Sequence, residues 1–164
     1  MKFKTTPYHF DLLKDEERLS AFYEAIKELS TSQELAYDLG CGSGILSFFL
    51  NSYFKEIIAI EQDFKASRCA KENLKSFKNI EVVNEDVLKY DFSKKCDLIV
   101  CEMLDTALID EEEVPVLNHA RNYLKENGKI IPQGIINTIE LARLERDYIC
   151  LLYTSPSPRD GLLS

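Results

Sequence analysis

Three glycines, Gly40, Gly42 and Gly44, follow a short apolar run ending in "AYDL" and precede a second one, "ILSFFL". Glycine accepts left-handed backbone angles and lets the main chain approach a ligand, so this spacing is typical of a strand-to-helix turn that borders a bound molecule. A dinucleotide fingerprint, G-x-G-x-x-G, would need glycine where the chain has Ile45. The spacing therefore indicates a ligand-binding turn without identifying the ligand.

Two acidic residues stand at predicted strand ends beside this turn. Asp38 comes two residues before Gly40, where a pyrophosphate would meet a repelling charge. Glu61 ends the next apolar run, 21 residues after Gly40, where a carboxylate can accept hydrogen bonds from ribose hydroxyls. A ligand with a ribose, a positive centre and no phosphate satisfies these features, and S-adenosylmethionine is such a ligand. The alternative is that Asp38 caps a turn and Glu61 is a solvated strand end.

The segments that must position these residues alternate between helix and strand patterns. Helices are expected over 11–29, 45–54, from an N-cap at Asp63 to about Leu74, and over 111–126 with a stop at Asn127-Gly128; strands are expected over 35–39, 56–61, 79–86, 96–102 and 129–132, and 135–145 could add a sixth. Such alternation with short connections predicts an α/β fold: a Rossmann-like, doubly wound, mainly parallel sheet with an N-terminal helix.

Composition narrows the possible partners. The 164-residue chain has 28 acidic and 20 basic residues, a net charge of −8, and its lysines and arginines are scattered, which disfavours nucleic-acid binding and favours a cationic partner; no DNA is expected. Five cysteines without CxxC spacing and only two histidines predict no metal site and reduced thiols. Without a signal peptide or a long apolar run, we expect a cytoplasmic protein that does not enter a membrane.

Composition also predicts the domain boundaries. Residues 1–30 form an N-terminal helical segment, 31–134 the Rossmann-like domain, and 135–150 the start of a further strand region. The last residues, "TSPSPRDGLLS", are rich in Pro, Ser and Gly and have no periodicity, so we expect a disordered tail over 151–164. The tail resembles translated sequencing-adapter sequence, which predicts that the native protein is truncated here and continues beyond about Tyr148.

Three motifs together resemble the class I S-adenosylmethionine-dependent methyltransferases: "DLGCGSG", "IEQD" at the second strand end, and "NEDV" after the third strand. The resemblance implies that Gly40 and Gly42 let the backbone approach the methionine moiety and that Glu61 holds the ribose. It also implies that Asp86 accepts from the adenine amino group while the Val87 N–H meets the ring. Asp86 could instead simply cap a turn.

The N-terminal helix resembles the segment that precedes the cofactor domain in protein arginine methyltransferases. The pattern there is H-x-x-M-L-x-D-x-x-R-x-x-x-Y-x-x-A-I; His9, Leu13, Asp15, Arg18, Ala25 and Ile26 match it, while Leu12 replaces Met and Phe22 replaces Tyr. The resemblance implies that Arg18 pairs with the carboxylate of the cofactor's methionine and that His9 belongs to the same site. Alternatively, Arg18 pairs with Asp15 or Glu17 on the surface, and His9 is a helix-start or packing residue.

The loop after the fourth strand, "CEMLDTALIDE", resembles the loop beginning S-E-W-M-G that carries two glutamates in that family. Glu102 and Glu111 have the family's nine-residue spacing, which implies a pair of carboxylates that grips one guanidinium and leaves a nitrogen aimed at the methyl group. "MLD" replaces W-M-G, and neighbouring acids at positions 110, 112 and 113 leave the register of the second carboxylate open. Glu111 could also be an ordinary first-turn acid of a helix.

Three functions remain open. The first is methyl transfer to a nitrogen of a cationic, arginine-like protein or small-molecule substrate. The second is RNA methylation, because the "EMLDTALIDEE" version also looks like archaeal proteins described as RNA methylases; the acidic composition and the lack of an N/D-P-P-Y motif count against it. The third is an inactive cofactor-binding fragment, since the family's β-barrel and T-H-W motif are not present in this sequence. The oligomeric state is not predicted.

Overall fold

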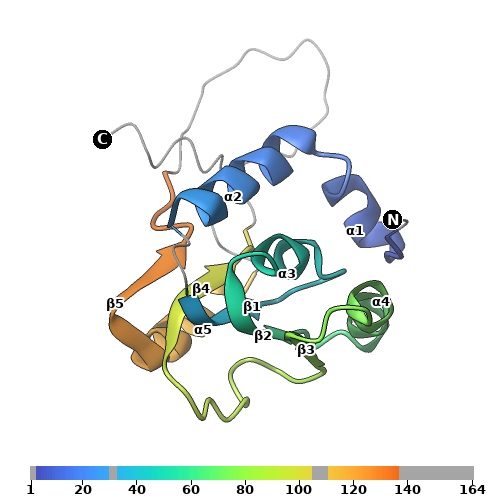
Figure 1. Ribbon diagram of the computed structural model, residues 1–164. Coiled ribbons are helices and arrows are strands. Elements are labelled where there is room, and N and C mark those ends of the chain that lie inside the picture. The colour runs from blue at the N-terminus through green and yellow to red at the C-terminus, as the bar shows by residue number, and fades with distance from the viewer. Residues whose placement is uncertain (1–2, 30–32, 105–110, 137–164) are drawn as a thin grey trace, which may run out of the picture.

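The computed structural model describes residues 3–29, 33–104 and 111–136. The elements in chain order are α1 (Pro7–Leu12), α2 (Glu16–Leu29), β1 (Gln33–Leu39), α3 (Ile45–Leu50), β2 (Phe54–Ile60), α4 (Phe64–Leu74), β3 (Ile80–Val83), β4 (Cys96–Cys101), α5 (Glu113–Ala120), a 3-10 turn (Arg121–Tyr123) and β5 (Leu124–Ile131) (Figure 1). The expected tail and sixth strand lie, entirely or almost entirely, outside the described residues. The helix N-cap expected at Asp63 is confirmed: its Oδ1 accepts from the Ala66 N–H at 2.7 Å.

The five strands form one parallel sheet in the order β3-β2-β1-β4-β5. The α/β, Rossmann-like prediction is therefore confirmed. From β1 the chain moves outward to β2 and β3 and then crosses back to β4 on the other side of β1. In open α/β sheets ligands bind outside the carboxyl ends of the strands at such a switch point. The turn after β1 and the loops after β2, β3 and β4 meet at that edge.

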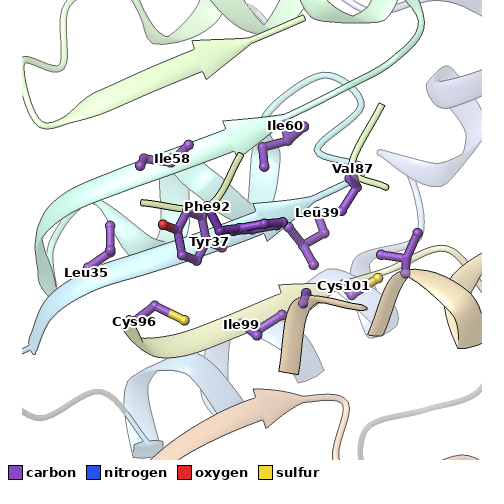
Figure 2. Packing of buried hydrophobic residues seen from close by; sticks show 12 residues of the cluster. Leu35, Tyr37, Leu39, Ile58, Ile60, Val87, Phe92, Cys96, Ile99 and Cys101 are labelled. Atoms are coloured by element: carbon purple, nitrogen blue, oxygen red, sulfur yellow. The ribbon is translucent and has the colours of Figure 1, made fainter. Parts of the chain in front are cut away.

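Alternating side chains of the strands pack two cores against opposite faces of the sheet. Leu35, Tyr37 and Leu39 point to the face covered by α5, whereas Ala36 points to the face covered by α2 and α3. Figure 2 shows the first core, in which the rings of Tyr37 and Phe92 meet edge to face with their centroids 4.9 Å apart. Both faces of the central strands β1, β2 and β4 are therefore covered, and their carboxyl ends are open to a ligand.

The expected single helix over 11–29 is wrong, because the segment divides into α1 and α2. Asp15 interrupts it: its Oδ1 accepts from the Arg18 backbone N–H at 2.9 Å, which is the bond of a helix N-cap. α1 in turn begins at Pro7 after a cap at Thr6. The break changes the direction of the chain, so that α2 packs on the sheet through Phe22 and Ile26 while α1 lies toward α4 (Figure 1).

Two other predicted helices are too long. α3 ends at Leu50, because Phe54 already enters β2 and is buried. α5 ends at Ala120 rather than near Glu126, and β5 includes the Asn127-Gly128 pair that looked like a helix stop. The β4–β5 register explains the second error: Cys96 pairs with Leu124 but Leu98 pairs with Lys129, so the intervening residues of β5 bulge. The helical spacing of Leu124 is therefore accidental.

Candidate functional site

A cavity of about 660 Å³ opens at the carboxyl edge of the sheet, between the strand ends and helices α1 and α2. It brings together side chains or backbone of nine predicted site residues: His9, Arg18, Gly40, Gly42, Glu61, Asp86, Val87, Glu102 and Glu111. The remaining two, Asp38 and Gly44, do not line it. Residues predicted from five separate segments thus converge on one site because parallel strands end at a common edge.

All three glycines of the turn have left-handed backbone angles, with φ of 69°, 54° and 85° at Gly40, Gly42 and Gly44. A Cβ on Gly40 would lie 2.8 Å from the Met103 side chain, and one on Gly42 would lie 2.8 Å from His9 Cδ2. The side chains of Met103 and His9 thus occupy the space beside these glycines that was expected for a ligand. A ligand can therefore contact this turn only through its backbone peptide groups.

Glu61 organises the turn from the end of β2. It is 7% exposed, and its two carboxylate oxygens accept the backbone N–H groups of Gly42 at 2.8 Å and of Asp63 at 2.7 Å. The alternative that Glu61 is a solvated strand end is wrong. Because each carboxylate oxygen has a second acceptor position, Glu61 can still accept from a ligand in the cavity that it lines.

Asp38 lies behind the turn rather than in the cavity. It is 1% exposed, and its Oδ2 accepts the Ser47 hydroxyl of α3 at 2.5 Å. Oδ1 is buried and has no hydrogen-bond partner among the described residues. Burial raises the pKa of Asp38 to about 7, with the nearby Glu61 and Glu102 adding to the effect and the bonds from Ser47 opposing it. Asp38 therefore ties β1 to the start of α3.

Arg18 and Glu102 meet across the cavity. Arg18 Nη1 lies 2.7 Å from Glu102 Oε1, with side-chain exposures of 10% and 18%, and Arg18 Nη2 donates to the Leu12 carbonyl at 3.0 Å. The surface pair of Arg18 with Asp15 or Glu17 is not the arrangement seen; the Asp15 side chain accepts from the Arg18 backbone N–H instead. Burial raises the pKa of the Glu102 carboxyl, the Arg18 charge opposes that rise, and the Glu111 charge adds to it.

The structure removes one candidate, Glu113, for the second acidic residue of this loop. Glu111 and Glu112 line the cavity, whereas Glu113 is 1% exposed in the first turn of α5 and does not. Residues 105–110, including Asp110, lie outside the described residues. Glu111, the predicted partner of Glu102, and its neighbour Glu112 thus both lie at the cavity, and the register of the second carboxylate stays a prediction.

His9 and Asp86 have local partners as well as cavity positions. His9 Nδ1 lies 2.7 Å from Thr6 Oγ1, and burial lowers the pKa of His9 despite the charges of Glu61 and Asp63. Asp86 accepts the Leu88 N–H at 2.9 Å and pairs with Lys89 Nζ at 2.9 Å, so it does cap its turn. The Lys89 bond is the main reason that the pKa of Asp86 is lowered.

Sequence reasoning missed two residues around the turn. Met103 packs against Gly40, and Ser47 holds Asp38. Ser47 lies nine residues after Asp38 on the inner side of α3, a spacing that becomes meaningful only once the strand-turn-helix geometry is known. Met103 follows Glu102 directly, and no sequence pattern indicated that it would reach back to the glycine turn.

A second groove, of about 560 Å³, lies at the opposite, amino edge of the sheet. Five lysines line it: Lys55, Lys78, Lys94, Lys95 and Lys125. The expectation of scattered basic residues is therefore wrong for this edge. Three of the five are ion-paired, Lys55 with Glu34, Lys94 with Glu56 and Lys125 with Asp97, at 2.6 to 2.7 Å.

No helix in the described part of the chain is long and apolar enough to cross a membrane. No group of three or more His, Cys, Asp or Glu side chains there is arranged to hold a metal ion.

Comparison with known proteins places the chain among methyltransferases. The sequence profile of the methyltransferase domain family matches residues 36–128. An uncharacterized protein of Methanothermobacter thermautotrophicus is 56% identical over 85% of this chain and 55% of its own length. A ribosomal protein L11 methyltransferase of Thermoanaerobacter pseudethanolicus is 32% identical over 70% of this chain and 36% of its own. The crystal structure of protein arginine methyltransferase 10 of Arabidopsis thaliana superposes with a TM-score of 0.67 at 26% identity, covering 76% of this chain and 38% of that one. The chain thus spans 55% of the length of the Methanothermobacter relative and less than two fifths of the length of the other two.

Proposed function

The chain belongs to the class I S-adenosylmethionine-dependent methyltransferases, and we propose that it transfers the cofactor's methyl group to a nitrogen of a cationic, arginine-like group on a protein or small molecule. The charged side chains around the cavity, in particular Glu102, support this choice of methyl acceptor.

The residues of the cavity fit S-adenosylmethionine. The cavity has a volume of about 660 Å³, which is in the range of small-molecule sites. The Nε of Arg18 is a buried donor without a hydrogen-bond partner among the described residues, and a ligand carboxylate would satisfy it. Carboxylates of Glu61, Asp86 and Glu102 surround the cavity, which suits a ligand with a positive sulfonium and hydroxyl donors and disfavours a phosphate.

We infer the following roles in holding the cofactor. Arg18 binds its carboxylate, Glu61 accepts from its ribose, and Asp86 with the Val87 N–H meets the adenine. The peptide groups of Gly40 and Gly42 border the methionine part, and His9 covers the turn. When bound, S-adenosylmethionine supplies an electrophilic methyl group. Asp38 and Gly44 act indirectly, by fixing the turn against α3 and α4.

The choice of a guanidinium as the methyl acceptor rests on Glu102. It follows β4 directly, at the switch point, and its carboxylate already forms a 2.7 Å ion pair with the guanidinium of Arg18. This half-buried carboxylate therefore has the geometry and charge to hold a guanidinium. Glu111 adds a second negative charge at the same cavity, and two carboxylates can orient one guanidinium with a nitrogen directed at the methyl group.

The proton balance fits the same residue. Methylation of a guanidinium nitrogen would form one N–C bond while the bond between the cofactor's sulfonium sulfur and its methyl group breaks, leaving a neutral thioether. One proton would be released, because the methylated guanidinium keeps a single positive charge. We infer that Glu102, which lines the cavity, accepts that proton, a role favoured by burial, which raises the pKa of its carboxyl. Most of the rate enhancement would come from orientation and from the field of the carboxylates rather than from a covalent intermediate.

The test is methyl transfer from radiolabelled cofactor to an arginine-rich peptide, to the same peptide with lysine in place of arginine, and to structured RNA. We expect label in the arginine peptide, loss of that label in Glu102→Gln, and retained cofactor binding in the variant. Glu34→Gln, which removes an exposed charge at the amino edge, serves as the control. Label in RNA alone that persists in Glu102→Gln would exclude the arginine acceptor.

RNA methylation is the second candidate, and the lysine groove is the observation that favours it. The groove lies at the amino edge, away from the cavity, and three of its five lysines are neutralised by neighbouring acids. Binding a polyanion there would require those pairs to open. Cofactor binding without labelling of any acceptor would instead favour the third possibility, a fragment that binds the cofactor but is inactive.

A further inference from the structure

Asn73 joins three separate segments beneath the candidate site. It lies in the last turn of α4, is 4% exposed, and uses its whole carboxamide. Its Oδ1 accepts the Lys4 N–H at 2.7 Å, while its Nδ2 donates to the Lys4 carbonyl at 2.7 Å and to the Ser43 carbonyl at 2.9 Å. The side chain thus pairs with Lys4 as a neighbouring strand would and holds the glycine turn with its remaining hydrogen.

The Lys4 contact controls the position of α1. Two residues later Thr6 caps α1, and its hydroxyl lies 2.7 Å from His9 Nδ1. The His9 ring in turn rests on the turn, so close that a Cβ on Gly42 would lie 2.8 Å from His9 Cδ2. The path from Asn73 through Lys4, Thr6 and His9 therefore returns to the turn that Asn73 also holds directly.

The Ser43 contact fixes the other side of the turn. Ser43 lies between two glycines in left-handed conformations, so its carbonyl direction depends on backbone angles that few residues adopt. Leu74, the next residue after Asn73, packs against Gly44, where a Cβ would lie 2.6 Å from its Cδ1. The end of α4 thus supports the turn at two adjacent positions, one polar and one apolar.

We propose that Asn73 is a positioning residue of the cofactor site, which sets the glycine turn and the α1 cover in register with each other. The inference rests on the proposed function, because the turn and α1 are assigned there to the cofactor. Asn73 itself does not line the cavity, so it acts only through Ser43 and Lys4. Removing it leaves two part-buried backbone groups of Lys4 and the buried Ser43 carbonyl without their partner, and the turn and α1 can then move independently.

The test compares Asn73→Ala with Asn79→Ala in the complete chain. Asn79 is a matched control, since its Nδ2 donates to the carbonyls of Asn51 and Phe54, at 3.2 and 2.9 Å, at the amino edge of the sheet. Binding of S-adenosylmethionine is measured by calorimetry and stability by urea unfolding. We expect Asn73→Ala to raise the Kd for the cofactor by roughly tenfold or more. We expect Asn79→Ala to lose stability without a change in Kd.

A second pair of variants guards against misfolding of Asn73→Ala. Lys4→Pro removes the N–H that Asn73 accepts, and Lys4→Ala keeps it, so the ratio of their Kd values isolates this backbone donor. We expect Lys4→Pro to bind the cofactor more weakly than Lys4→Ala, and the backbone amides of its glycine turn to exchange hydrogen with solvent faster. Equal binding by wild type and Asn73→Ala, or equal weakening in Asn79→Ala, would show that Asn73 has no positioning role. Failure of the wild type to bind the cofactor would instead overturn the proposed function itself.

Discussion

Arg18 from the first turn of α2 and Glu102 from the end of β4 form a 2.7 Å ion pair inside the candidate site. Each residue has a separate proposed partner: a cofactor carboxylate for Arg18 and an acceptor guanidinium for Glu102. In the proposed arrangement, the pair would couple the two subsites electrically. A cofactor carboxylate would draw Arg18 toward itself and free Glu102, whereas a bound guanidinium would compete with Arg18 for Glu102.

The first prediction is that this ion pair contributes measurably to stability. A double-mutant cycle with Arg18→Ala and Glu102→Gln should give a coupling free energy of about 1–3 kcal/mol, because both side chains are largely shielded from water. The control is Lys55–Glu34, which is as close at 2.6 Å but 70% and 62% exposed, and should give no more than about 1 kcal/mol. Urea unfolding measures both. Equal coupling in the two pairs would mean that the cavity pair is solvated.

The second prediction concerns pH. The pKa of Asp38 is about 7 in the folded protein against an ordinary value of 3.8, so between these values the folded state binds more protons than the unfolded state. The free energy of unfolding contributed by Asp38 must therefore fall as pH rises through this window and level off above it, with a slope of at most about 1.4 kcal/mol per pH unit. Asp38→Asn stays neutral and should lose this slope.

Comparing the wild type with Asp38→Asn separates the contribution of Asp38 to stability from the contributions of other titrating groups. The raised pKa of Glu102 gives a contribution of the same sign, and the lowered pKa of His9 gives one of opposite sign. Both groups are present in the wild type and in the variant, so the difference between their stability curves reports Asp38. Asp91→Asn, a change at an exposed site, is the control. Parallel curves for wild type and Asp38→Asn would contradict a neutral, buried Asp38.

The sequence predicts which acids come together better than it predicts the bounds of the elements around them. The acids that follow β2, β3 and β4 line one cavity, because strand ends are marked by abrupt changes from apolar to acidic residues and parallel strands share an edge. Helix ends were predicted poorly, because at Asp15 and Leu124 the spacing of apolar residues continues across a chain reversal or into a strand.

Long-range polar pairs could not be predicted at all. Nothing near Arg18 or Glu102 in the chain indicates that they meet, since their contact depends on how α2 packs across the sheet. Asn73 is a similar case: a polar residue near charged neighbours at the end of a helix is expected to be exposed, and only the approach of Lys4 and the glycine turn buries it. The resemblance to a family supplied roles for Arg18 and Glu102, but not the pair that they form.

The third prediction separates two roles of Glu61. Glu61→Gln replaces an acceptor of two backbone N–H groups and should lower the free energy of unfolding by about 1–3 kcal/mol. If Glu61 also accepts from the ribose, the variant should weaken binding of S-adenosylhomocysteine more than binding of its 2′,3′-dideoxy analogue. Calorimetry gives both affinities, and Glu56→Gln, an exposed position on the same strand, is the control. An equal effect on both ligands would leave Glu61 with the turn alone.

The fourth prediction tests the left-handed backbone and the close packing at Gly42 separately. Gly42 has φ of 54°, and a Cβ there would lie 2.8 Å from His9 Cδ2. Gly42→Ala should therefore lower the free energy of unfolding by about 1–3 kcal/mol through backbone strain and through the clash. Adding His9→Ala removes the clash but not the strain, so the double variant should recover only part of the loss relative to His9→Ala. Gly134→Ala, where a Cβ meets nothing within 4 Å, should be nearly neutral. Chemical denaturation of the four variants measures these differences. Full recovery in the double variant would show that the left-handed angle itself costs nothing, and no recovery would show that His9 does not rest on the turn.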